Sequence, residues 1–275
     1  MILGEPNPTP LDLNFEIFKI PVRVSGFFWV LPVIFGAQLG HPVFFLVTGL
    51  VIFTGVLVHE LGHALTMRRF GISPRIVLTM MGGFATSDYQ NVWNLASTSG
   101  RKNSTQQMII SAAGPIAGFA LAGLVAFFLV ALGGWVQFSL NAYYLPSWSI
   151  ELSKGTPFVR EFLNTTEFPT NRDLIHSMIN YALFVNIYWG LMNLLPVYPL
   201  DGGQIAREAM VQADPREGLR NSLWLSVVVG AAIGFAALMI LQAAFMAILF
   251  GIFAFQSWQT IQKMDGKGFG SGRPW

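Results

Sequence analysis

The chain has 275 residues, of which 53% are hydrophobic and only 11% are charged, with a formal net charge of +2. Soluble globular proteins carry about 25% charged residues, so this composition excludes an ordinary soluble domain and places the chain in a lipid bilayer. The slight basic excess gives no reason to expect a nucleic-acid partner, because cytoplasmic loops of membrane proteins are rich in Lys and Arg. The absence of cysteine excludes disulfides and thiolate ligands, so a metal site must use His, Asp, Glu or water.

The elements predicted in chain order begin with residues 15–24, a short strand or surface segment rich in β-branched and aromatic residues. Residues 71–87 carry β-branched runs broken by Gly82 and Gly83, which predicts a hairpin. Residues 134–173 are expected to form a mixed loop. Apolar runs predict membrane spans at 26–39, 43–68, 108–132, 174–195, 222–240 and 243–261. A crossing needs about 20 residues, so the first of these is short and would have to start earlier or tilt.

The last two spans come from one apolar run, residues 222–261, which is too long for a single crossing and is divided near Leu241 and Gln242. The expected fold class is therefore an all-α polytopic membrane protein, with about six transmembrane helices and a small membrane-flanking β-hairpin or sheet. The first residues are polar and rich in proline, without the order of a cleavable signal peptide.

The basic residues are unequally distributed about this topology. Thirteen of the sixteen Lys and Arg residues fall on one side, and three fall on the other, Lys154, Arg160 and Arg172. The positive-inside rule then places both termini in the cytoplasm. We expect a multi-pass integral membrane protein, with a prokaryotic cytoplasmic membrane favoured over an organelle membrane.

Residues 59–63 read His-Glu-Leu-Gly-His, the HExxH pattern. Residues four apart lie on one face of a helix, so His59 and His63 can reach one ion. Neutral imidazole suits Zn²⁺, and Glu60 would lie beside the open coordination position, where it can take a proton from water. The alternative is a pair of packing histidines with a satisfied glutamate. Ionisable groups in an apolar span are costly, however, and indicate a functional site by default.

A catalytic zinc site needs a third protein ligand and one position for water. Asp201 is the best candidate, since it lies in the segment NLLPVYPLDGG, where prolines interrupt the helix and two glycines let the backbone turn closely. Non-helical backbone at membrane depth is tolerated only where it is buried in protein or lines a cavity. The alternative is an ordinary Asp-Gly turn. The predicted topology, however, places Asp201 and the HExxH motif at the same, cytoplasmic side.

Four features resemble the site-2 protease family of intramembrane metalloproteases, in the same order over residues 15–260: HELGHAL after an apolar run, a Gly-Gly hairpin segment, AAGP opening the next span, and NLLPVYPLDGG much later. The resemblance implies that Glu60 is the catalytic acid/base. It also implies that one zinc ion per chain is held by three ligands, His59, His63 and Asp201.

The resemblance also implies that Asn193 helps to hold the substrate or the oxyanion, with an interhelical hydrogen bond as the alternative. Family members often carry an Asn shortly after the Gly-Pro of the third span. This chain has Gly118 there, so no role is carried over to that position. The PDZ or CBS-type domains of some members have no room here, so we expect residues 1–275 to form a single membrane-embedded metalloprotease core.

The expected reaction is hydrolysis of a peptide bond within or near a transmembrane segment of another membrane protein, as in regulated intramembrane proteolysis. A helix hides its carbonyls in its own hydrogen bonds, so the substrate must unwind before attack. An exposed strand from residues 72–87 could hold the unwound peptide by edge pairing.

Two alternatives stay open. A non-proteolytic membrane metal-binding protein or transporter predicts that zinc crosses the membrane or that Glu60 is dispensable. Another type of HExxH membrane peptidase, acting on soluble or prenylated peptides, usually takes a Glu as its third ligand. Glu208 is the only acidic residue besides Asp201 at a plausible depth after the motif. The sequence names neither the substrate nor the oligomeric state.

Overall fold

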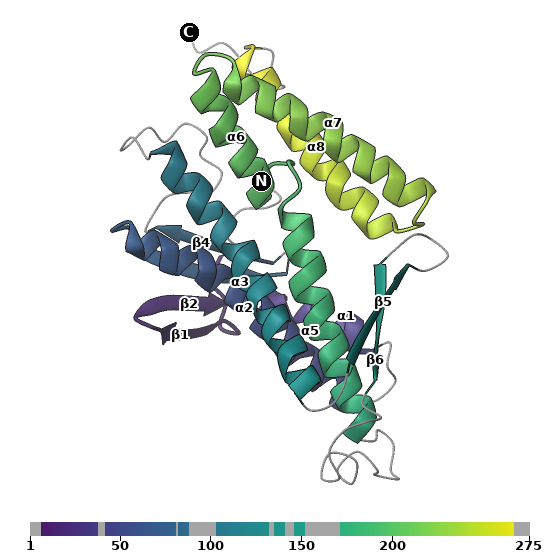
Figure 1. Ribbon diagram of the computed structural model, residues 1–275. Helices are drawn as coiled ribbons and strands as arrows, with labels where there is room; N and C mark the ends of the chain where they lie inside the picture. Colours follow the sequence, from purple (N-terminus) through teal and green to yellow (C-terminus); the bar gives the residue numbers. More distant parts are fainter. Residues whose placement is uncertain are drawn as a thin grey trace. The chain divides into compact units, whose positions relative to one another are not determined.

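Helices predominate in the chain (Figure 1), which a computed structural model describes over residues 7–37, 42–80, 82–87, 103–131, 135–140, 146–151 and 171–266. The chain divides into two compact units. The first consists of Met1–Gly100 and Ala113–Gly190, and the second of Arg101–Ala112 and Leu191–Trp275. The strands belong to the first unit.

The first unit contains a four-stranded sheet with the order β1-β2-β3-β4. Both hairpins are antiparallel, whereas β2 and β3 pair in parallel. The strands are β1 (Leu13–Ile17), β2 (Ile20–Val24), β3 (Pro74–Thr79) and β4 (Gly82–Ser87). The hairpin predicted from residues 71–87 is thus confirmed. Residues 15–24, which are expected from the sequence to form one short strand or surface segment, instead belong to two strands, β1 and β2. The two glycines of the second hairpin begin β4 rather than forming the turn, because Gly82 pairs with Thr79.

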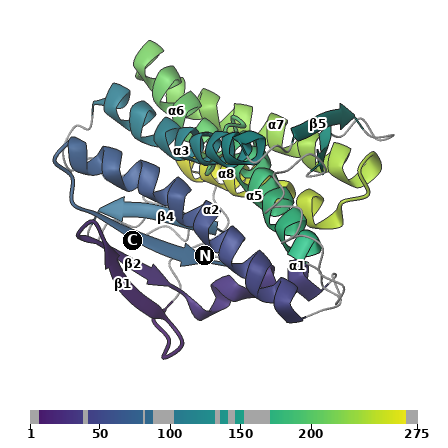
Figure 2. The same ribbon diagram turned by 60° about the horizontal axis from the view of Figure 1, so that its bottom comes forward.

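Helix α2 (Pro42–Arg69) packs on this sheet (Figure 2). Alternate residues of β2 and β3 point to one face, as the period of a strand requires, and they form a core with apolar residues of α2. That core contains Ile20, Val22, Val24, Ile76 and Leu78 from the strands and Ile52, Val56, Leu57 and Ala64 from the helix. The sheet therefore supports the helix that carries the HExxH motif.

The remaining helices of the first unit are a short 3-10 turn, η1 (Gly26–Trp29), then α1 (Val30–Ala37), and parts of α3 (Ser104–Ala131) and α5 (Asn171–Asn193). Small residues allow α2 and α3 to cross closely. A Cβ added at Gly62 would stand 2.8 Å from the Ala117 Cβ and closer still to the Ala113 carbonyl oxygen. Contact between backbones of this kind is typical of membrane helices.

The second unit contains α6 (Asp201–Ala213), α7 (Gly218–Met239) and α8 (Ala244–Met264). Helices α7 and α8 lie side by side (Figure 1), and a Cβ at Gly230 would stand 3.3 Å from the Ala254 Cβ. Between them Gln242 adopts the left-handed conformation, with φ +52°. The predicted division of residues 222–261 near Leu241 and Gln242 is therefore confirmed.

Four helices are long and apolar enough to cross a membrane: α2, α3, α7 and α8. The predicted spans at 26–39 and 174–195 are not among them, so the count of six is not confirmed. Helix α1 has only eight described residues. Helix α5 has 23 residues, but His176, Asn180 and Asn186 lower its hydropathy.

The prediction of a loop over residues 134–173 was wrong in part. Strands β5 (Trp135–Leu140) and β6 (Pro146–Glu151) form a separate antiparallel pair. The alternation of apolar and polar residues in WVQFSL is the period-2 signal of a strand, and the sequence reading overlooked it. Residues 152–170 of the predicted loop lie outside the described residues.

Candidate metal and catalytic site

The two histidines of the HExxH motif face each other on α2. Their Nε2 atoms lie 3.2 Å apart, and the side chains are almost fully buried, with exposed fractions of 3% for His59 and 8% for His63. A tetrahedral zinc ion with bonds of about 2.0–2.1 Å would hold two nitrogens about 3.3 Å apart. The spacing of the two rings therefore fits a shared zinc ion.

Helix α3 leaves space beside these nitrogens at Gly114. A Cβ added at Gly114 would stand 2.8 Å from His59 Nε2 and 2.5 Å from His63 Cε1, and closer still to His63 Nε2. Any side chain at this position would therefore fill the space next to both nitrogens. Because residue 114 is glycine, that space stays open to an ion.

Glu60 is buried between α2 and the sheet, with an exposed fraction of 3%. The backbone of β4 at Gly83 lies directly against it. A buried carboxylate without compensation is expensive, and ionisable groups in membrane spans indicate function by default. The position of Glu60, one residue from His59, suits proton transfer at the open coordination position of an ion.

The segment before α6 folds back on itself, which brings Asp201 to the first residue of that helix. Cβ atoms at Gly202 and Gly203 would both collide with the backbone of this segment, at Leu194 and Val197 respectively. The Tyr198 N–H donates a hydrogen bond of 3.0 Å to Ser226 Oγ on α7. Only glycine therefore fits at both positions. The start of α6 packs directly on the backbone of residues 194–198.

Two local effects act on the polar groups of this segment. The N-terminus of a helix carries a partial positive charge, which stabilises an ionised carboxylate such as that of Asp201. Burial raises the pKa of the Tyr198 phenol, with Arg207 acting in the opposite direction. The phenol is therefore neutral at pH 7, and Asp201 is the acidic group in the first turn of α6.

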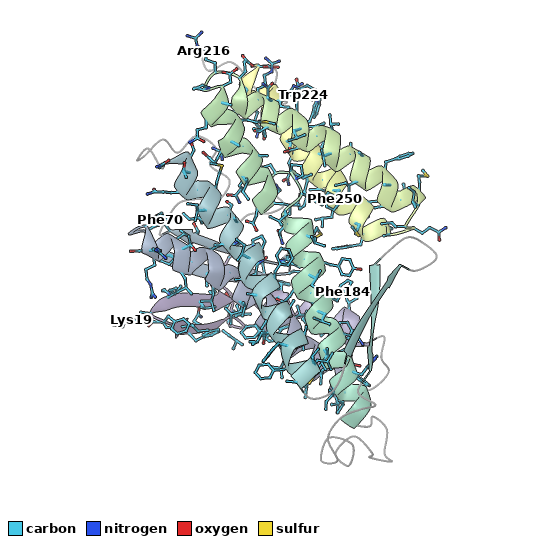
Figure 3. All side chains as sticks on the ribbon, viewed as in Figure 1. Lys19, Phe70, Phe184, Arg216, Trp224 and Phe250 are labelled. Atoms are coloured by element: carbon cyan, nitrogen blue, oxygen red, sulfur yellow. The ribbon has the colours of Figure 1, made fainter. Side chains whose placement is uncertain are left out.

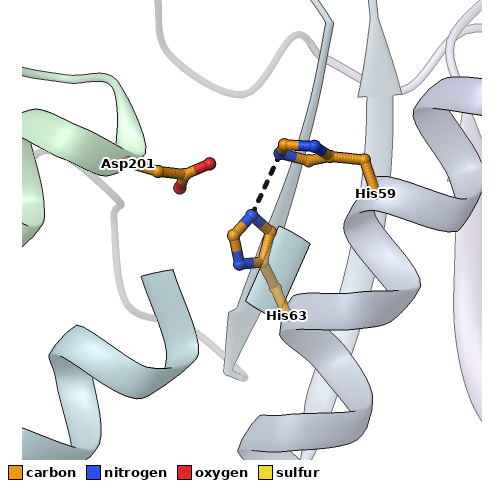
Figure 4. Close-up of side chains that lie close together, drawn as sticks. All are labelled: His59, His63 and Asp201. Carbon is orange, nitrogen blue, oxygen red and sulfur yellow. Dashed lines mark hydrogen bonds between the residues drawn. The ribbon is translucent and has the colours of Figure 1, made fainter. Parts of the chain in front are cut away.

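Among the described residues, one group of three side chains could hold a metal ion, and it consists of the three predicted ligands. Ring nitrogens of His59 and His63 and a carboxylate oxygen of Asp201 lie within 4.8 Å of one another (Figure 4). All three side chains are buried. Two imidazoles and a carboxylate leave the fourth position of a tetrahedral zinc ion for water, so these residues fit a catalytic zinc.

Asn193, the remaining candidate residue, lies outside the group of three ligands. It is the last residue of α5 and is buried, with an exposed fraction of 8%. The sequence did not predict the position of Gly114 beside the two histidines or the contact between Gly83 and Glu60. The signals were present in the AAGP and Gly-Gly segments, but neither shows which side chain its glycine meets.

Comparisons with known proteins agree with this chemistry. Residues 47–241 match Peptidase family M50, a range that includes the HExxH motif and Asp201. This match, together with four candidate membrane spans, places the chain in the class of membrane metalloproteases. The chain belongs to peptidase family M50, the site-2 protease family.

Two matches from Methanocaldococcus jannaschii, one in sequence and one in structure, illustrate the similarity. A zinc metalloprotease is 24% identical over 196 residues, which are 70% of this chain and 43% of that protein, so the match spans less than half of the relative's length. The solved structure of a site-2 protease has the same fold, with a TM-score of 0.51 and 20% identity, over 91% of this chain and 95% of the solved chain.

Proposed function

We propose that this chain is a zinc endopeptidase that hydrolyses a peptide bond within or near a transmembrane segment of another membrane protein. The observation that supports it best is the pair of imidazole nitrogens 3.2 Å apart on α2, buried beside Glu60 in an apolar helix. Such a set of ionisable groups in a membrane span requires a compensating partner, and one zinc ion per chain supplies it.

The proposed ligands are His59, His63 and Asp201. A bound Zn²⁺ supplies a Lewis acid that polarises water and the scissile carbonyl. Glu60 takes a proton from water while the water oxygen bonds to the carbonyl carbon. Glu60 then passes that proton to the amine nitrogen as the carbon–nitrogen bond breaks. The Asn193 amide would donate a hydrogen bond to the carbonyl oxygen as negative charge develops on it.

The substrate would be bound as an extended strand along β4. This strand is at the end of the sheet order, with β3 as its partner in the described part of the chain, and its backbone lies against Glu60 at Gly83. Strand addition to a sheet edge holds an unwound peptide by main-chain hydrogen bonds. Ile76 and Leu78 lie on the inner strand β3 and are fully buried, so they support the edge rather than contact the substrate.

The proposed topology is that of the sequence prediction. In it, α1 and α5 cross the membrane in addition to the four candidate spans, which gives six spans. Both termini would then lie in the cytoplasm of a prokaryotic cell. Because the chain lacks cysteine, single cysteines introduced near either end can be tested with a thiol reagent that does not cross membranes. Labelling of intact cells at either terminus would contradict this topology.

The experiment that tests the function is purification in detergent, elemental analysis, and incubation with a transmembrane test substrate beside a Glu60→Gln variant. We expect one zinc per chain in both proteins and cleavage only by the wild type. A wild type that holds no zinc, or equal cleavage by Glu60→Gln, would contradict the proposal. Zinc uptake by proteoliposomes without any cleavage would indicate a transporter instead.

A further inference from the structure

The backbone of α3 at Gly114 bounds the space in which an ion would be held. A zinc ion stands about 2.0–2.1 Å from each imidazole nitrogen. A Cβ at residue 114 would stand 2.8 Å from His59 Nε2 and closer still to His63 Nε2. A Cβ so near to both nitrogens would lie in the space that the zinc ion needs.

We propose that Gly114 is a positioning residue for the metal site, whose lack of a side chain keeps the coordination space open. This inference rests on the proposed zinc-dependent function. The α2–α3 crossing is already in close contact at Gly62, which packs on Ala113 and Ala117. Room for a Cβ at residue 114 must therefore come from displacing a histidine ring, and a displaced ring no longer points at the ion.

The test is metal binding by Gly114→Ala, with Gly123→Ala as the matched control. Both glycines lie on α3, and both substitutions raise helix propensity by the same amount, but a Cβ at Gly123 meets no atom within 4 Å. We expect Gly123→Ala to retain zinc after dialysis and to show the wild-type absorption spectrum with Co²⁺. Gly114→Ala should bind about 10–100-fold more weakly, as for other changes that disturb ligand orientation.

The outcomes separate this inference from the proposed function. Absence of zinc from the wild type would overturn the function, whereas wild-type zinc affinity in Gly114→Ala would overturn the inference alone. A second measurement uses melting temperatures without metal. Because the collision is with the rings, Gly114→Ala should lower the melting temperature, or prevent folding, in the wild-type background and do so much less in a His63→Ala background. Equal effects in both backgrounds would also overturn the inference.

A different observation concerns the tip of the β1–β2 hairpin. Phe18 and Lys19 form its turn with positive φ values of 51° and 61°. Asn-Gly adopts this turn readily, whereas a bulky side chain at positive φ is strained and unusual. Phe18 is nevertheless 66% exposed, so its ring gains no core packing that would offset the strain. Strain of this kind points to a function for the side chain.

The hairpin tip lies at the C-terminal end of helix α2. Arg68 Nη1 donates a hydrogen bond to the Phe18 carbonyl oxygen, and Arg68 and Arg69 are the last residues of α2, a candidate span. Lys19 lies at the same end of the unit as Phe70, the residue after α2 (Figure 3). A helix α2 that crosses the membrane would place this tip near the membrane–water interface.

We infer that this tip anchors the unit to anionic phospholipid headgroups, with the Phe18 ring at the acyl boundary. Three exposed cations, Lys19, Arg68 and Arg69, lie near one exposed acid, Glu16. Aromatic rings prefer the interface, and each basic residue near an anionic surface contributes to binding. The α2 span and the hairpin would then be fixed at one depth in the bilayer.

The test uses the cysteine-free chain in lipid nanodiscs. A spin label at Phe18→Cys should relax more with oxygen than with a water-soluble nickel complex, whereas a label at Leu11→Cys, 77% exposed before β1, should show the reverse. Lys19→Gln should reduce the rise in melting temperature caused by phosphatidylglycerol. Equal water exposure of the two labels, or an unchanged rise with Lys19→Gln, would overturn the inference.

Discussion

Gly83 on β4 lies directly against Glu60 on α2. A Cβ added at residue 83 would stand 2.5 Å from Glu60 Cγ and 2.8 Å from its Oε1, distances that no real Cβ contact tolerates. The strand that we propose to hold the substrate is therefore also the surface that confines the proposed general base. The backbone of β4 would therefore set the positions of both Glu60 and the bound peptide.

Gly83→Ala should slow cleavage because the methyl group displaces Glu60 from its place beside His59. General acid–base catalysis contributes about 10²–10⁴-fold, so we expect a loss of kcat within that range with zinc content unchanged. The measurement is cleavage of a transmembrane substrate together with elemental analysis. Gly123→Ala, which has open space for its Cβ, is the control, and a full-speed Gly83→Ala enzyme would refute the role of this contact.

Asp201→Asn should weaken zinc binding, since it replaces a charged ligand with a neutral amide at the N-terminus of α6. The matched control is Glu208→Gln on the same helix, which removes an equal charge outside the group of three ligands. Competition with a zinc-binding dye measures both affinities. If Glu208→Gln proved the weaker zinc binder, the choice of the third ligand would be wrong.

Ser226→Ala should destabilise the segment that leads to Asp201. The Ser226 hydroxyl accepts the Tyr198 N–H and donates to the Ser222 carbonyl oxygen, and it is 1% exposed. A buried N–H left without its acceptor costs about 1–3 kcal/mol. We expect a lower melting temperature and weaker zinc binding.

The control for this change is Ser257→Ala on α8. That hydroxyl is equally buried but has no hydrogen-bond partner in the described part of the chain, so its removal should be neutral or stabilising. Equal losses in the two variants would mean that the Tyr198–Ser226 hydrogen bond has no special importance.

Asp12→Asn should destabilise the first hairpin in a pH-dependent way. The Asp12 carboxylate accepts hydrogen bonds from Thr9 Oγ1 at 2.6 Å and from Arg23 Nε at 2.7 Å. The Thr9 hydroxyl, together with Arg23 and backbone N–H groups, lowers the pKa of Asp12 well below its ordinary value of 3.8, while burial opposes this.

A lowered folded-state pKa stabilises the protein above the unfolded value, and this stabilisation is lost as pH falls through the folded value. Wild type and Asp12→Asn should therefore differ in melting temperature at pH 7, and the difference should shrink as pH falls below about 4. Asp265→Asn, which removes an exposed ion pair with Arg220, should have a small effect. A difference for Asp12→Asn that stays constant from pH 7 to pH 2 would contradict the prediction.

Helix stability in the substrate should control the cleavage rate. If the peptide must unwind to pair with β4, a Gly pair near the scissile bond, which lowers helix propensity by about 1 kcal/mol per residue, should speed cleavage relative to a Leu pair. Two substrates that differ only at these positions provide the measurement. Faster cleavage of the Leu substrate would indicate that unwinding is not required.

Several features could be predicted from the sequence because their signals are local. The HExxH spacing places His59 and His63 on one helix face through the helix period alone, and they do face each other. The hairpin of residues 71–87 and the break near Gln242 follow from turn chemistry and from the length of a span. The helix predicted over residues 174–195 is present as α5, but its polar residues lower its hydropathy, and it is not among the candidate membrane spans.

The sequence by itself determined the candidate ligand types, the membrane class and the peptidase family, since each depends on residue identity and on patterns local in the chain. The tertiary structure decided which strand forms the sheet edge, that Gly83 confines Glu60, and that Gly114 borders the two imidazoles. These contacts join segments more than 20 residues apart in the chain. The identity of a glycine does not indicate which side chain it contacts. The roles of Gly83 and Gly114 therefore follow only from the packing of β4 and α3 against α2.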